Sequence, residues 1–155
     1  MTTTITQPTA RLPAPSPLPG TGPDIALPVE SRAFHALHHH AYLAYATAHT
    51  PTGADNLIRD TFGTLAVNWA TLLRSPNPTA AAWDHVAAHI ARHTPRLTLH
   101  TISPLHYQLT VLHHLAGLSA ITAADTTGCD HSTARTLLRT PYHSSTAEQE
   151  RRRSR

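Results

Sequence analysis

Residues 117–138 read GLSAITAADTTGCDHSTARTLL, and this stretch decides the fold. Ser119 is a suitable N-cap for a short helix, because its hydroxyl can accept a hydrogen bond from a backbone N–H. Gly128 breaks that helix, Asp130 caps a second one, and Pro141 stops the second. Two short helices joined by a tight glycine turn, with another helix before them, predict a helix-turn-helix unit.

The helix before this pair has its own start and stop signals. Ser103 is a favourable cap and Pro104 is tolerated in the first turn, while Gly117 ends the helix. Residues 94–102, which precede it, alternate leucine with polar residues. That alternation is compatible with a short strand, but an extended linker is favoured in a helical chain. The apolar face of the helix consists of Leu105, Leu109, Leu112 and either Leu115 or Ala116.

Three further helices are predicted upstream of residue 94. The first runs from a Ser31 cap to residue 48, the second covers 54–73, and the third covers 79–93. In the second helix the apolar residues step by four and three positions, which places them on one continuous face. The inward-facing residues of the three helices are, in order, Phe34, Leu37 and Ala41; Ile58, Phe62, Leu65, Trp69 and Leu72; and Trp83, Val86, Ala87 and Ile90.

These patterns predict an all-α chain with two small helical domains. Residues 30–94 form the first domain and residues 103–143 the second, with a linker at 95–102. Residues 1–29 are rich in proline and threonine, so they cannot bury enough apolar surface to offset the entropy of ordering, and we expect disorder there. Residues 144–155 form a polar and basic tail.

The composition favours a cytoplasmic protein. The chain has 155 residues and a net charge of +3, and all of its basic residues other than histidine are arginines. The single Cys129 cannot form an intrachain disulfide, no apolar run is long enough for a membrane span, and the N-terminus lacks the apolar core of a signal peptide. The sequence pI of about 9.6 overstates how basic the folded part is, because RRRSR occupies residues 151–155.

The stretch at 117–138 resembles the C-terminal domain of ECF sigma factors of bacterial RNA polymerase, which reads the minus-thirty-five promoter element. In that family a Gly-Leu-Ser entry leads to an alanine-rich helix, a glycine turn and a recognition helix. Leu137 stands where the family often has arginine. The matching residues are Gly117, Leu118, Ser119, Ala124, Gly128, Thr133, Ala134, Arg135, Thr136 and Leu138.

Three upstream segments are also similar to this family, in the family's order. SRAFHALHHHAYLAYA (31–46) resembles its first helix. GADNLIRDTFGTLAVNW (53–69) resembles its polymerase-docking helix, with Asn56 in place of an acid. AAAWDHVAAHIARH (80–93) resembles the helix that borders the minus-ten-reading surface. The resemblance implies a first, three-helix domain that binds polymerase and a second, helix-turn-helix domain that binds DNA.

The resemblance also implies which residues make these contacts. The core of RNA polymerase, at its clamp, would be bound through Asp55, Asn56, Arg59 and Asp60. Promoter DNA would be contacted in its major groove by the recognition-helix residues His131, Ser132, Arg135, Thr136 and Arg139. The minus-ten DNA would be approached by the outer-surface residues His85, His89 and Arg92. The family further implies an anti-sigma factor as a candidate partner, and no cofactor.

Electrostatics keeps a second interpretation open. The charges between residues 119 and 140 are Asp125, Asp130, Arg135 and Arg139, which sum to zero, whereas DNA affinity depends mainly on neutralised phosphates. Trp69 and Trp83 fall on buried stripes, so the first domain offers no obvious aromatic for unstacked bases. The alternative is a degenerate sigma-like module that binds polymerase or a regulatory protein with little DNA recognition. The acids and arginines would then be ordinary solvated residues, with Asp55 favoured by its helix dipole.

A third hypothesis is a metal site or metal-dependent enzyme built on the histidine clusters. Residues 85–93 read HVAAHIARH, which stacks His85, His89 and His93 on one side of a helix. However, the chain has no His-Glu-x-x-His motif, no cysteine partner and no acid between these histidines. We therefore expect neither a metal site nor catalysis.

Overall fold

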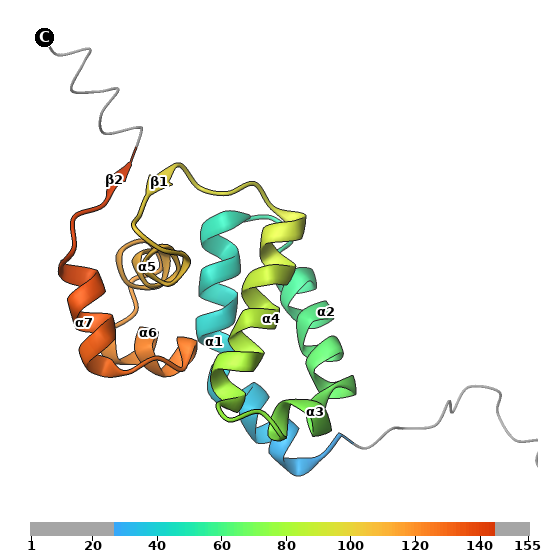
Figure 1. Ribbon diagram of the computed structural model, residues 1–155. Coiled ribbons are helices and arrows are strands. Elements are labelled where there is room, and N and C mark those ends of the chain that lie inside the picture. The colour runs from blue at the N-terminus through green and yellow to red at the C-terminus, as the bar shows by residue number, and fades with distance from the viewer. Residues whose placement is uncertain (1–26, 145–155) are drawn as a thin grey trace, which may run out of the picture.

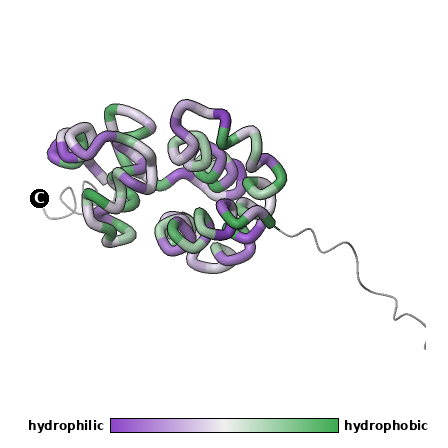
Figure 2. The backbone as a smooth tube through the Cα atoms, turned by 90° about the horizontal axis from the view of Figure 1, so that it is seen from below, coloured by the Kyte–Doolittle hydropathy of each residue, from purple (hydrophilic) through white to green (hydrophobic). Residues whose placement is uncertain are grey.

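The computed structural model describes residues 27–144, and this part of the chain is mostly helical (Figure 1). The predicted disordered stretch and the predicted tail fall almost wholly in residues 1–26 and 145–155, outside the described residues. Green hydrophobic and purple hydrophilic segments alternate along the helices (Figure 2). The amphipathic patterns of the sequence thus run through both halves of the fold, which are residues 27–94 and residues 95–144. No helix within residues 27–144 is long and apolar enough to cross a bilayer.

Helix α1 (Val29–His49) begins three residues earlier than the predicted Ser31 cap implies. Its N-cap is Pro28, and Ser31 is a buried residue inside the first turn, so the predicted serine cap is wrong. The inward face is also shifted, because Leu37 is 75% exposed while its neighbour His38 is buried. The rings of Tyr42 and Tyr45 decide this rotation: both are buried and lie on the His38 side of the helix.

The predicted helix over 54–73 is interrupted by one residue. Helix α2 (Ala54–Val67) ends and helix α3 (Trp69–Leu73) begins at Asn68, whose side-chain amide donates to the Thr64 carbonyl at 2.9 Å. A side-chain bond to the carbonyl four residues earlier competes with the regular helical ladder and allows the break. The predicted stripe is nevertheless confirmed, since Ile58, Leu65, Trp69 and Leu72 are buried and Phe62 packs partly buried against them.

Helix α4 (Pro78–His93) begins one residue before the predicted start at residue 79. The side-chain oxygen of Asn77 accepts a hydrogen bond from the Ala80 N–H at 3.0 Å, and Pro78 occupies the first turn. The predicted inward residues Trp83, Val86 and Ile90 are buried. This helix is central to the fold, because it contacts helices of both halves (Figure 1).

The segment after α4 is more than a linker. Strand β1 (Leu99–His100) pairs in antiparallel fashion with strand β2 (His143–Ser144). The preference for an extended linker over a short strand is therefore wrong at these two residues. The strand could not be identified from sequence, because its partner strand lies more than 40 residues further along the chain, and pairing across that distance is set by the tertiary fold.

The remaining helices match the predicted helix-turn-helix closely. They are α5 (Pro104–Thr110), which continues into the π-helical turn η1 (Val111–Leu115), then α6 (Ala120–Thr127) and α7 (His131–Arg139). The hydroxyls of Ser103 and Ser119 cap α5 and α6 as predicted. They accept hydrogen bonds from the N–H groups of His106 and Thr122, at 3.1 and 3.0 Å. Asp130 occupies the N-cap position of α7, but its side chain forms no capping hydrogen bond.

The helix-turn-helix packs tightly against α4 and α1. The turn between α6 and α7 brings Gly128, with φ of +70°, so close to α4 that an added Cβ would lie 2.6 Å from the Ala80 nitrogen. The Asn77 amide donates to the Gly128 carbonyl at 2.8 Å, and the Trp83 indole N–H donates to Gln108 at 2.8 Å. The buried residues of the two halves belong to one hydrophobic cluster.

We expect Gly128→Ala to destabilise the fold by about 2–4 kcal/mol, because the new Cβ adds overpacking to left-handed backbone strain. Gly117→Ala is the matched control: its φ is +75°, yet nothing lies within 4 Å of the added Cβ. Strain alone should cost that variant about 1 kcal/mol. Urea unfolding measures both. Equal losses in the two variants would contradict the close approach of α4 and the turn.

Candidate nucleic-acid and protein interfaces

Helix α7 turns its predicted DNA-contacting residues to solvent. Ala134 is fully buried, and Leu137 and Leu138 are half-buried against the core. This packing leaves the rest of the helix surface uncovered. The exposed residues include all five candidates, His131, Ser132, Arg135, Thr136 and Arg139.

The two guanidinium groups on this face are available. Within residues 27–144, neither Arg135 nor Arg139 forms a hydrogen bond or an ion pair. The Thr136 hydroxyl donates to the Ser132 carbonyl at 2.9 Å, which still leaves its oxygen able to accept. An arginine without a protein partner can bind a phosphate or the edge of guanine without first breaking an internal contact.

Asp125 is an important neighbour that the sequence analysis did not assign to any site. Its Oδ1 lies 2.7 Å from His131 Nε2, joining α6 to the first residue of α7. It also acts electrostatically on His38 of α1, where it opposes the lowering of the pKa that burial causes. The contact could have been predicted from the sequence, because Asp125 lies six residues before His131, on the other side of the Gly128 turn. This carboxylate is a negative charge beside the first residue of α7.

The four candidate polymerase contacts lie together on the outer side of α2. Asp55, Asn56, Arg59 and Asp60 are all exposed, and the Arg59 guanidinium donates to the Asn56 side chain at 3.1 Å. Figure 1 places α2 and α7 on opposite sides of the molecule, with α1 and α4 between them. One chain therefore presents two separate surfaces.

Asp55 and Arg59 border a groove between α1 and α2 with a volume of about 720 Å³. Its floor is largely apolar, with Phe62 and Ala66 contributed by α2, and its rim carries Arg32 as well. A concave, largely apolar strip with charges along its edge suits a protein partner, because protein interfaces combine an apolar centre with a polar rim.

The histidine row on α4 does not lie as expected. His85 and Arg92 are exposed, but His89 is half-buried and its Nε2 is shielded without a hydrogen-bond partner. His93 is exposed, and its ring centroid lies 4.3 Å from that of His89, with the two ring planes tilted by 39°. The expectation that His89 points away from the core is wrong, because α2 packs against this side of α4.

The surroundings of His89 keep it neutral. Burial lowers its pKa, and the charges of His93 and Arg92 lower it further, while Asp60 of α2 acts in the opposite direction. The Arg92 guanidinium donates toward His89 Nδ1 at 3.5 Å, so the ring proton belongs on the shielded Nε2. The row is therefore not a uniform cationic strip.

No group of three or more histidine, cysteine or acidic residues in the described part of the chain is arranged to hold a metal ion. Comparison with models of protein families, with curated proteins and with solved structures finds no match for the chain. The exposed face of α7 and the outer side of α2 are therefore the features of the molecule that indicate a function.

We expect acid to destabilise the fold through His38, which is buried, and His49, which is half-buried. Burial lowers the pKa of His38 and His49, so both are neutral in the folded state near pH 7. Above the unfolded-state pKa of about 6.5 neither state binds a proton there. As pH falls below that value the unfolded chain takes up protons first, and the free energy of unfolding decreases until the folded-state pKa is reached.

Urea unfolding at about pH 7.5 and about pH 5.5 measures this loss on either side of the unperturbed histidine pKa. His49→Gln should reduce the pH dependence, whereas His40→Gln, an exposed position on the same helix, serves as the control. A chain that is equally or more stable at the lower pH would contradict the assignment.

Proposed function

We propose that the chain is a sigma-like transcription regulator that binds the core of RNA polymerase through its N-terminal helices and promoter DNA through α7. The observation that carries the proposal is the exposed face of α7, which is anchored to the core by Ala134. This face carries Arg135 and Arg139, neither of which is paired within residues 27–144. That arrangement in a helix-turn-helix suits insertion in the major groove. In this role the protein would act in the cytoplasm and direct transcription initiation.

Within this proposal each α7 residue contacts the part of DNA that its side-chain chemistry suits. Arg135 has the planar fork of donors that reads guanine in a bidentate manner, and it lies near the middle of the helix. Ser132 and Thr136 offer hydroxyls, and Arg139 offers a second guanidinium near the helix end, for phosphates or base edges. Few such contacts are present, so binding to DNA alone should be weak and polymerase should supply the rest of the affinity.

Polymerase docking is proposed for the α2 surface. Asp55 and Asp60 would face a basic coiled coil on the clamp, as the resemblance implies, and charge pairs of this kind supply steering and register. The neighbouring apolar groove between α1 and α2 would add contact area. An anti-sigma factor would compete for the same surfaces.

The second candidate is a degenerate module with little DNA recognition. Two observations favour it: Asp125 and Asp130 place acids at the start of α7, and Trp69 and Trp83 are 8% and 1% exposed, so neither is available to stack on unpaired bases. The second candidate would bind polymerase or a regulatory protein, and it differs from the first in selecting no promoter.

Gel-shift titration with promoter fragments, with and without core polymerase, separates the two candidates. We expect little shift without polymerase and a sequence-selective shift with it. Arg135→Gln should cost about 1–3 kcal/mol of sequence discrimination, and Arg74→Gln, an exposed arginine at the end of α3, should cost none. If polymerase and protein together select no promoter, the DNA-reading proposal fails and the degenerate module stands.

A further inference from the structure

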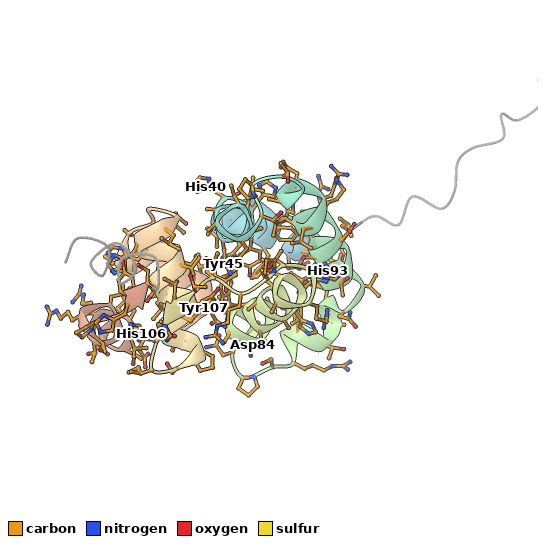
Figure 3. All side chains as sticks on the ribbon, turned by 90° about the horizontal axis from the view of Figure 1, so that it is seen from above. His40, Tyr45, Asp84, His93, His106 and Tyr107 are labelled. Atoms are coloured by element: carbon orange, nitrogen blue, oxygen red, sulfur yellow. The ribbon has the colours of Figure 1, made fainter. Side chains whose placement is uncertain are left out.

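A second concavity lies where the two halves of the fold meet. It has a volume of about 340 Å³, within the range of about 300–1,000 Å³ common for small-molecule sites. Seen from above, Tyr45, Asp84 and Tyr107 lie along this junction (Figure 3). Its walls come from α1, α4, the segment that follows α4, and α5.

The cavity exists because small residues line one wall. Ala87, Ala88 and Ala91 of α4 carry no side chain beyond Cβ, which leaves room in front of the rings of Tyr45 and Tyr107. Both tyrosines are buried, at 3% and 6% exposure, so the aromatic wall is held by the core rather than by solvent-facing side chains. The result is an apolar and aromatic interior open at one side.

Hydrogen bonds fix the aromatic wall. His49 Nδ1 lies 2.9 Å from the Tyr45 carbonyl, which can only accept, so in the neutral ring Nδ1 is the donor and Nε2 the acceptor. The Tyr107 hydroxyl therefore donates to His49 Nε2 at 2.8 Å, and the Leu97 N–H donates to the same tyrosine oxygen at 3.1 Å. The Tyr107 ring is thus pre-positioned before any ligand arrives.

Two opposite charges line this cavity without pairing. The Arg96 guanidinium lies over the Tyr107 ring, 4.4 Å from its centroid, and Asp84 is an exposed acid of α4. No ion pair within 4.0 Å joins them in the described chain. Asp84 forms no hydrogen bond in this part of the chain either, so each charge keeps its capacity to bind a group of opposite sign.

From this arrangement we propose that the junction cavity binds a small zwitterion with an apolar or aromatic body, the chemistry of a free α-amino acid. Arg96 would take the carboxylate and Asp84 the ammonium group, while the tyrosine and alanine walls enclose the body. The site goes beyond the proposed function, because it involves neither α7 nor the outer side of α2.

Occupancy would act on the whole fold. The walls come from both halves, so a ligand that fills the cavity binds the packed arrangement and has no equivalent site in a chain whose halves have separated. Such a ligand stabilises the packed arrangement by mass action. The protein would then respond to a small metabolite independently of its macromolecular partners.

The test is calorimetric titration of the full chain with L-phenylalanine and L-leucine, paired with thermal unfolding at the same concentrations. At least one of the two should bind and raise Tm. Asp84→Asn and Arg96→Gln should each weaken binding by at least about tenfold, since each removes a charge-assisted contact. Ala88→Leu, at an exposed position of the α4 wall, should fill the cavity and abolish binding without changing any charge.

The controls isolate the two charges. Glu30→Gln and Arg74→Gln remove exposed charges elsewhere and should leave the affinity unchanged. Phenylpropionate and phenethylamine each keep one charge of phenylalanine and should bind at least about tenfold more weakly. The proposal is overturned if neither amino acid binds at about 10 mM, if either charge variant folds and binds like the wild type, or if a single-charge analogue binds as tightly as phenylalanine.

Discussion

The close approach of the Gly128 turn to the start of α4 is the contact on which the rest of the structure depends. It requires a residue without Cβ at φ of +70°, and it is secured by the Asn77 amide, which also belongs to the residue that caps α4. The Asn77 side chain thus caps α4 and also forms a hydrogen bond that holds the helix-turn-helix against it. A hydrogen bond between Trp83 of α4 and Gln108 of α5 joins the two halves at a second place, and the buried residues of both halves form one core.

This packing has a direct consequence for function. Since Ala123 and Ala124 of α6 and Ala134 of α7 are buried in the core, the outer sides of these two helices are left for a partner, and the candidate residues of α7 lie there. The α2 surface lies across the molecule, so DNA and protein partners would not compete for the same residues (Figure 1). The junction cavity lies between these two surfaces in the fold and belongs to neither. A sigma-like regulator with a separate small-molecule site is the interpretation that uses all three features.

Local chemistry explains which parts of the fold the sequence predicted. Ser103 and Ser119 cap their helices because capping needs only neighbouring residues. Features that depend on distant neighbours were missed: the burial of His38 in place of Leu37 follows from where the core lies, and the strand at Leu99 requires Ser144 as its partner. The sites divide in the same way. The exposure of the α7 candidates follows from the burial of Ala134 on the opposite side of the same helix. The shielding of His89, in contrast, depends on the packing of α2. The contact of Asp125 with His131 depends on the turn between α6 and α7.

The central claim is that this chain selects promoters together with polymerase, and transcription in vitro tests it most directly. Core RNA polymerase would be incubated with the full chain and a library of genomic fragments, and the transcripts would be sequenced. The account predicts initiation at a defined set of sites that is absent with core polymerase alone and reduced by Arg135→Gln. Transcripts that are the same with and without the chain would contradict it, even if the chain is retained by polymerase in a pull-down.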